Sequence, residues 1–103
     1  MKGYALHPEA YNDIDEIREY IADENPDAAD RVVTEIFDSI RSLVSFPEQG
    51  FRRPHLTSRP LRFRVVREYV IAYAPAKTPL WVVAVFHGRR SPRVIAAILR
   101  GRE

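Results

Sequence analysis

The apolar residues of this chain change their spacing at Gly50, and that change constrains the fold more than any other feature. Before Gly50, apolar residues recur at every third or fourth position, which is the spacing of one face of an α-helix. After Gly50, they alternate with polar residues or form short continuous runs, which is the pattern of β-strands. The sequence therefore predicts a helical first half and a second half made mainly of strands.

A short strand over residues 3–6 and two helices are predicted in the first half. The first helix covers residues 8–24, and the second begins at Pro26, with Asn25 as its N-cap, and ends at Phe46. The inward-facing residues are Ala10, Ile14, Ile17 and Ile21 in the first helix, and Ala29, Val32, Val33, Ile36, Ile40, Leu43 and Val44 in the second. Because the connection between the two helices is so short, they must form an antiparallel hairpin.

Three strands are predicted in the second half, over residues 61–65, 69–73 and 80–86. Strict alternation in the first of them places Arg62 and Arg64 on one face and Leu61, Phe63 and Val65 on the other. The third is apolar on both faces, and Trp81 and Phe86 are assigned to the core. We therefore expect this third strand to be the central one.

A last helix is predicted over residues 93–100, after an N-cap at Ser91 and a first-turn proline. Its inward residues are expected to be Val94, Ala97 and Ile98, with Leu99 as a further candidate. The element order is thus β-α-α-β-β-β-α. A helical hairpin packed on a mostly antiparallel sheet gives a two-layer α+β domain, predicted to be a single domain over residues 1–103.

The charge of the chain is divided between its halves. Residues 1–50 carry 4 basic and 12 acidic side chains, whereas residues 51–103 carry 12 basic and 2 acidic ones. Because the two signs fall in different layers of the predicted fold, we expect little neutralisation within the molecule and a basic binding surface. Arginine suits bidentate binding of carboxylate or phosphate. An acidic protein partner is favoured over nucleic acid, and a solvated sheet face is the plainer alternative.

Several kinds of chemistry are excluded or disfavoured by composition. The chain has no cysteine, which excludes disulfides, thiolate metal sites and cysteine nucleophiles. His7, His55 and His87 lie too far apart in sequence for a metal motif, and Asp13 is interpreted as part of a solvated helix face; we expect no metal and no cofactor. No glycine-rich phosphate loop or serine nucleophile motif is present. Without an apolar run of ~20 residues or a secretory signal, a cytoplasmic protein that does not associate with membranes is expected.

The segment His87-Gly88-Arg89-Arg90 follows the predicted central strand and holds candidate functional side chains. Polar and charged side chains at the end of a buried strand are a common arrangement for binding or catalysis. The structural alternative is a tight turn, with Gly88 supplying a backbone conformation that other residues avoid.

Short motifs follow one another along the chain in a fixed order. They are Ala10 with Asp13-Ile14 and Ile17, Asn25-Pro26 with Ala28-Ala29, Leu43 with Phe46-Pro47 and Gly50, residues 69–73, and residues 82–90. This ordered set resembles the RelE/ParE superfamily of bacterial toxins, and specifically its ParE branch, over nearly the whole chain. The resemblance implies a RelE/ParE-like fold and the toxin role in a type II toxin–antitoxin module, of the kind linked to plasmid stabilisation.

The superfamily contains two activities, and the resemblance allows a choice between them. RelE-like members are ribosome-dependent mRNA endonucleases, whereas ParE-like members inhibit DNA gyrase and have no established catalytic residues. RelE-type toxins carry arginines where this chain has Val70 and Gly88, and a tyrosine in the C-terminal segment, where this chain has none after Tyr73. Valine and glycine cannot activate a 2′-hydroxyl or stabilise phosphorane charge. Gyrase inhibition is therefore the favoured interpretation.

The resemblance also implies partners and candidate sites. The cognate antitoxin would fold its acidic, disordered C-terminal segment along the groove between helices and sheet, giving a toxin–antitoxin hetero-oligomer. The predicted antitoxin contacts are Arg62, Arg64 and Arg89, and the predicted gyrase contacts are His87, Arg90, Arg93 and Arg100. No catalytic residue is expected; if the protein is instead a ribonuclease acting on mRNA at the ribosome, His87, Arg89 and Arg90 are the candidates. An inactive relative that binds an antitoxin is the third alternative.

Overall fold

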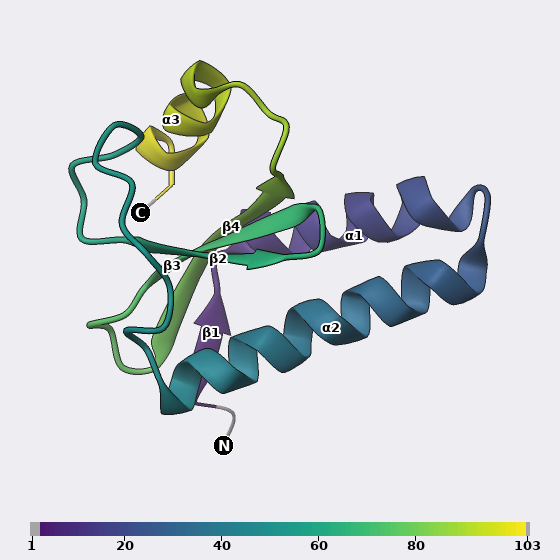
Figure 1. Ribbon diagram of the computed structural model, residues 1–103, viewed down its shortest axis with the longest axis horizontal. Helices are drawn as coiled ribbons and strands as arrows, with labels where there is room; N and C mark the ends of the chain where they lie inside the picture. Colours follow the sequence, from purple (N-terminus) through teal and green to yellow (C-terminus); the bar gives the residue numbers. More distant parts are fainter. Residues whose placement is uncertain (1–2, 103) are drawn as a thin grey trace.

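The computed structural model describes residues 3–102 and has the predicted order of elements. These are β1 (Tyr4–Leu6), α1 (Pro8–Ala22), α2 (Pro26–Ser45), β2 (Arg62–Val66), β3 (Tyr69–Ala74), β4 (Leu80–His87) and α3 (Pro92–Arg100). The α+β class and the antiparallel helical hairpin are confirmed (Figure 1).

Each helix begins where a capping side chain meets a proline. Asn25 Oδ1 accepts a hydrogen bond from the Ala28 amide at 3.0 Å, and Ser91 Oγ accepts one from the Val94 amide at 3.2 Å. His7 caps α1 in the same way through Nδ1. These local bonds satisfy amides at the helix start that have no partner within the helix, which is why the sequence predicted the three starts correctly.

The sheet has the strand order β1-β4-β3-β2, so β4 lies between two neighbours, as predicted. Pairs β2–β3 and β3–β4 are antiparallel, whereas β1 runs parallel to β4. The short β1 pairs only with Leu80–Val82. The rest of that edge of β4 therefore has no strand beside it and faces α1.

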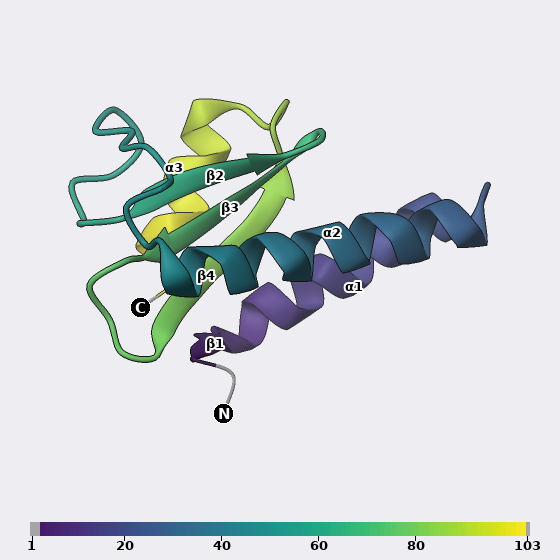
Figure 2. The ribbon, with the colours of Figure 1, turned by 60° about the horizontal axis from the view of Figure 1, so that its bottom comes forward.

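Helices cover both faces of the sheet. The hairpin of α1 and α2 packs on one face, and α3 lies on the other together with the loop between α2 and β2 (Figures 1 and 2). Tyr73 and Ile71 point into the hairpin core, while Phe63 and Val83 point into the α3 core. All four side chains are fully buried, so the middle of the sheet is apolar on both faces.

One detail of the predicted packing is wrong. In α3, Ile95 and Leu99 are buried, whereas Val94 and Ala97, which were expected to face inward, are exposed, and Ile98 is partly buried. The two arginines of this helix, Arg93 and Arg100, lie seven positions apart on its outer side. The inward face is therefore centred opposite them on Ile95 and Ile98, and the prediction placed it too far toward Val94 and Ala97. In β2, Val65 lies on the same face as Phe63, as the alternation predicts, and is 48% exposed because it lies near the end of an edge strand.

The expectation that the two charged halves do not neutralise each other is also wrong. Arg62 pairs with Glu48 at 2.9 Å, and Arg67 makes two hydrogen bonds of 2.7 Å to the Glu35 carboxylate. The Glu35 pKa is lowered by the hydrogen bond from Arg67. Arg102 also pairs with an acidic residue of α1. The hairpin thus compensates part of the basic half.

The cations without an ion pair inside residues 3–102 form a smaller set. Seven of them are exposed, namely Arg31, Arg52, Lys77, Arg89, Arg90, Arg93 and Arg100, and three are partly buried, namely Arg53, Arg59 and Arg64. The predicted contacts Arg64, Arg89, Arg90, Arg93 and Arg100 all belong to this set. Within the same residues, no helix combines the length and apolar character needed to cross a bilayer.

Candidate functional site

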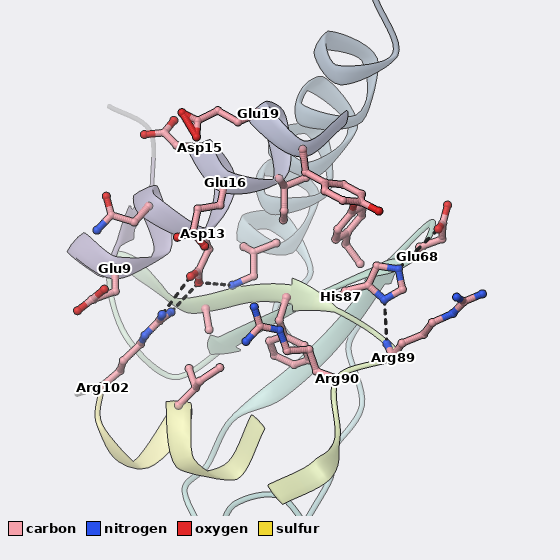
Figure 3. Close-up of a pocket in the computed structure, with 18 residues that line it drawn as sticks. Glu9, Asp13, Asp15, Glu16, Glu19, Glu68, His87, Arg89, Arg90 and Arg102 are labelled. Carbon is pink, nitrogen blue, oxygen red and sulfur yellow. Dashed lines mark hydrogen bonds and ion pairs between the residues drawn. The ribbon is translucent and has the colours of Figure 1, made fainter. Parts of the chain in front are cut away.

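A cleft of about 1010 Å³ lies between α1 and the part of β4 that β1 leaves unpaired. Its other walls come from the β2–β3 turn, the segment after β4 and the end of α3. Figure 3 shows the side chains around it, with Asp13 and Arg102 at one end and His87 and Glu68 at the other. The cleft therefore brings together residues from α1, the β2–β3 turn, β4 and the segment that follows β4.

Asp13 and Arg102 close one end of this cleft with a two-pronged ion pair. The guanidinium nitrogens of Arg102 lie 2.6 and 3.0 Å from the two carboxylate oxygens of Asp13. The same carboxylate accepts a hydrogen bond from the Val85 amide at 3.0 Å, and Arg102 donates to the Val83 carbonyl at 3.1 Å. The two side chains thus occupy backbone groups of β4 that a neighbouring strand would otherwise bind.

This pair is largely shielded from water. The side chain of Arg102 is 12% exposed and that of Asp13 is 16% exposed. The hydrogen bond to Asp13 raises the pKa of Arg102, so the guanidinium stays charged. The interpretation of Asp13 as part of a solvated helix face is therefore wrong.

At the other end of the cleft, His87 is held by three neighbours. Its Nδ1 accepts a hydrogen bond from the Arg89 amide at 3.0 Å, and its Nε2 lies 3.6 Å from a carboxylate oxygen of Glu68. The ring also packs edge-on against Tyr69, with 5.4 Å between ring centroids. Because Nδ1 acts as an acceptor, the neutral ring carries its proton on Nε2. A hydrogen-bond donor is thus aimed at the cleft mouth, beside the exposed carboxylate of Glu68.

The remaining groups near His87 limit what this end of the cleft can do chemically. Burial raises the pKa of the Tyr69 hydroxyl, with a further contribution from the Glu68 charge, so Tyr69 is a poor general base near neutral pH. Arg89 and Arg90 are exposed and free of ion pairs with residues 3–102. They can bind an anion from solvent.

Gly88 allows a close approach of the backbone, whereas the sequence suggested that it supplies a backbone conformation that other residues avoid. Its φ is not in the left-handed region; among the described glycines only Gly3 is. Its amide donates to the Glu68 carbonyl at 2.8 Å, and a Cβ at position 88 would lie 3.3 Å from that oxygen. Close approach of the backbone therefore favours glycine here.

The charge of the cleft is mainly negative. The carboxylates that line it beyond the Asp13–Arg102 pair are those of Glu9, Asp15, Glu16, Glu19 and Glu68. Only Arg89 and Arg90 oppose them, because Arg102 is neutralised by Asp13. This cleft is consequently better suited to a cationic or mixed-charge ligand than to an acidic one.

Of the predicted antitoxin contacts, the structure places Arg62 and Arg64 together on β2 and Arg89 apart from them. Arg62 lies level with Tyr73 and Val82 across the sheet, whereas His87 lies level with Val66, four residues further along β2. At about 3.3 Å per residue, Arg62 and the His87 end are about 13 Å apart along the strands.

Arg62 and Arg64 also have contacts within the chain. They lie on the hairpin face of β2, where Arg62 donates to the Gly50 carbonyl at 2.7 Å and Arg64 donates to Gln49 at 2.8 Å. A partner that binds these two arginines must exchange or share those contacts.

Three of the four predicted gyrase contacts, His87, Arg90 and Arg93, lie between the end of β4 and the first turn of α3. Arg100 is at the opposite end of α3, about 10 Å away along the helix axis.

The residues that sequence reasoning missed are Asp13 and Arg102. Asp13 precedes the inward-facing Ile14 and lies three positions after the buried Ala10, so its place on the helix gave a usable signal. Arg102 gave none, because its partner lies 89 positions away. Within residues 3–102, no group of three or more histidine, aspartate or glutamate side chains is placed to hold a metal ion.

Comparison with known proteins finds a family of toxins. The family described as the ParE toxin of the type II toxin–antitoxin system parDE matches residues 4–92. A protein of Sinorhizobium fredii (strain NBRC 101917 / NGR234) named "Putative toxin Y4kP" is 38% identical over 66 residues, which are 64% of this chain and 60% of that protein. The chain thus matches about 60% of the length of this relative. The family match ends at the first residue of α3.

Proposed function

Because the chain belongs to the ParE toxin family of type II toxin–antitoxin systems, we propose that it is the toxin of such a pair, inhibiting DNA gyrase until a cognate antitoxin neutralises it. The observation that carries this proposal is the family match, which includes both helices of the hairpin and all four strands. Gyrase inhibition is the activity of this branch of the superfamily. It requires a binding surface rather than a catalytic set.

The proposed gyrase-contacting surface lies where β4 ends and α3 begins. Arg90 and Arg93 are exposed there without ion pairs to residues 3–102, next to the half-buried His87. Unpaired guanidinium groups can bind carboxylates of a protein or phosphates of DNA. Arg100, at the far end of α3, extends this surface only if the partner covers the whole helix.

An mRNA endonuclease of the RelE type is the second candidate, because His87, Arg89 and Arg90 do meet at one end of the cleft. Two features disfavour it. Val70 points into the α3 core, and Gly88 has no side chain, so neither position supplies a cation to the cleft. The acidic residues of α1 would also repel the phosphates of an RNA strand.

Expression of the chain in bacteria tests the proposal. We expect growth arrest with induction of the DNA-damage response, relieved by co-expression of a cognate antitoxin. Rapid loss of messenger RNA without DNA damage would instead identify a ribonuclease. Unimpaired growth, with the protein folded and abundant, would identify an inactive relative.

A further inference from the structure

A second concave site lies at the other end of β4, away from the cleft. It has a volume of about 840 Å³ and is formed by the β3–β4 loop, the segment before β2 and the last turn of α3. We call it the basic pocket and define it by Arg59, Leu61, Lys77, Trp81 and Arg100. Arg100 lies beyond the part of the chain that the family match covers.

The described ionisable residues that line the basic pocket are all cations, namely Arg59, Lys77, Arg100 and Arg102. Arg102 is neutralised by Asp13. Arg59 donates to the Leu99 carbonyl at 2.7 Å and to the Arg102 carbonyl, which orients its guanidinium without cancelling the charge. Lys77 and Arg100 are exposed and have no ion pair within residues 3–102. Three uncompensated positive charges therefore surround this pocket.

The pocket also has an apolar floor. Leu61 and Ala74 are buried beneath it, Trp81 is half-buried at its wall, and Pro60 and Pro79 flank it. An apolar side chain can leave water by entering such a site, while acidic groups on either side of it reach the cations at the rim. A phosphate backbone would use the rim charges but would leave the apolar floor without a partner.

From these observations we propose that the basic pocket binds an acidic peptide segment that carries an apolar anchor residue. Resting on the proposed function, the inference assigns this segment to the antitoxin. The cleft along α1 supports the assignment by contrast, because its carboxylates would repel an acidic chain. The antitoxin's acidic part thus docks on the α3 side of the sheet, close to Trp81.

Trp81 makes this proposal directly measurable, because it is the only tryptophan of the chain. The first probe is a short synthetic peptide with glutamates on both sides of a single leucine. A second peptide has glutamines in place of the glutamates, and a third probe is a single-stranded DNA oligonucleotide. Each is titrated into the full chain while the emission of Trp81 is recorded.

The variants test where the acidic peptide binds. Lys77→Glu combined with Arg100→Glu reverses two charges at the rim of the basic pocket. The matched control is Arg31→Glu combined with Arg52→Glu, which changes the net charge by the same amount at exposed residues that line neither the pocket nor the cleft. We expect the Lys77→Glu/Arg100→Glu variant to bind the acidic peptide about tenfold or more weakly than the wild-type chain does. The Arg31→Glu/Arg52→Glu variant should bind it less than about threefold more weakly. Equal weakening in both, equal binding of the glutamine peptide, or tighter binding of the oligonucleotide would overturn the proposal.

Repeating the titration with the antitoxin itself separates this inference from the proposed function. Antitoxin that binds the wild-type chain and the Lys77→Glu/Arg100→Glu variant equally well would overturn the pocket assignment and leave the toxin–antitoxin pair intact. Antitoxin that binds neither would refute the pairing. The peptide titration would then still decide whether the pocket takes acidic segments.

Discussion

Replacing Asp13 by alanine removes the contact that joins α1, β4 and the end of the chain. The substitution deletes both hydrogen bonds from Arg102 and the acceptor for the Val85 amide. Leaving that amide without a partner costs about 1–3 kcal/mol. We expect the free energy of unfolding to fall by about 3 kcal/mol in total.

That total lies at the lower end of the roughly 3–5 kcal/mol that breaking a fully buried ion pair costs, and the reason is the position of Arg102. Arg102 follows the last turn of α3 and its side chain is already 12% exposed, so its guanidinium can move into water once Asp13 is absent. Arg102→Ala leaves Asp13 bonded to Val85, and we expect a loss of about 2 kcal/mol. Asp13→Asn keeps an oxygen acceptor for Val85 and should cost less than Asp13→Ala.

Urea unfolding of the wild-type chain, both alanine variants and the double variant forms a complete double-mutant cycle. We expect the double variant to be about as stable as Asp13→Ala, with a coupling free energy of about 2 kcal/mol between the two side chains. The denaturant slopes should stay equal, so that the midpoints compare directly. Additive losses within about 0.5 kcal/mol, or no loss in Asp13→Ala, would refute the role assigned to this pair.

Three other perturbations test separate parts of the account. Tyr73→Phe should lower the free energy of unfolding by about 1–3 kcal/mol in urea, because the buried Gly50 amide loses the Tyr73 hydroxyl as its acceptor at 2.9 Å. Burial raises the Tyr73 pKa, so the contribution of the neutral hydroxyl to the free energy of unfolding is complete below the ordinary tyrosine pKa of about 10. This contribution is lost as the pH rises through the higher pKa of the folded state. In Tyr73→Phe, the free energy of unfolding should therefore fall less steeply with pH in the alkaline range. Asn25→Ala should cost about 1 kcal/mol through the lost cap of α2, and an unchanged thermal midpoint would contradict this. Arg62→Gln with Arg64→Gln should slow association with the antitoxin at low salt if these residues contact it; an unchanged rate in stopped-flow mixing would exclude them.

The elements could be predicted from sequence because their signals are local. Asn25 with Pro26 and Ser91 with Pro92 define helix starts within a few residues, and the change of spacing at Gly50 separates helices from strands. The central place of β4 followed from its continuous apolar run. These features depend on neighbours in sequence, which the chain displays directly.

The errors concern contacts between distant parts of the chain. Arg67 pairs with Glu35 at a separation of 32 positions, and Arg102 pairs with Asp13 at 89. Net charge per half cannot reveal such pairs, which is why neutralisation was underestimated. One error is not of this kind: in α3 the spacing of Arg93 and Arg100 marks the outer side, and the side opposite them, where Ile95 and Leu99 are buried, could have been read from the sequence.

In the candidate site, too, the features set by local sequence could be predicted and those set by contacts between distant residues could not. The placement of His87, Arg89 and Arg90 at the end of the central strand followed from sequence order. The acidic wall of the cleft did not, because it requires α1 to lie beside the unpaired edge of β4. The contacts predicted for Arg62, Arg64 and Arg89 remain a prediction.

The most direct test of the gyrase proposal is to incubate the purified protein with DNA gyrase, supercoiled plasmid and ATP, and to score linear DNA after denaturation. The account predicts that linear plasmid accumulates with increasing protein and that prior mixing with the antitoxin prevents it. Absence of linear DNA together with unimpaired supercoiling would contradict gyrase as the target.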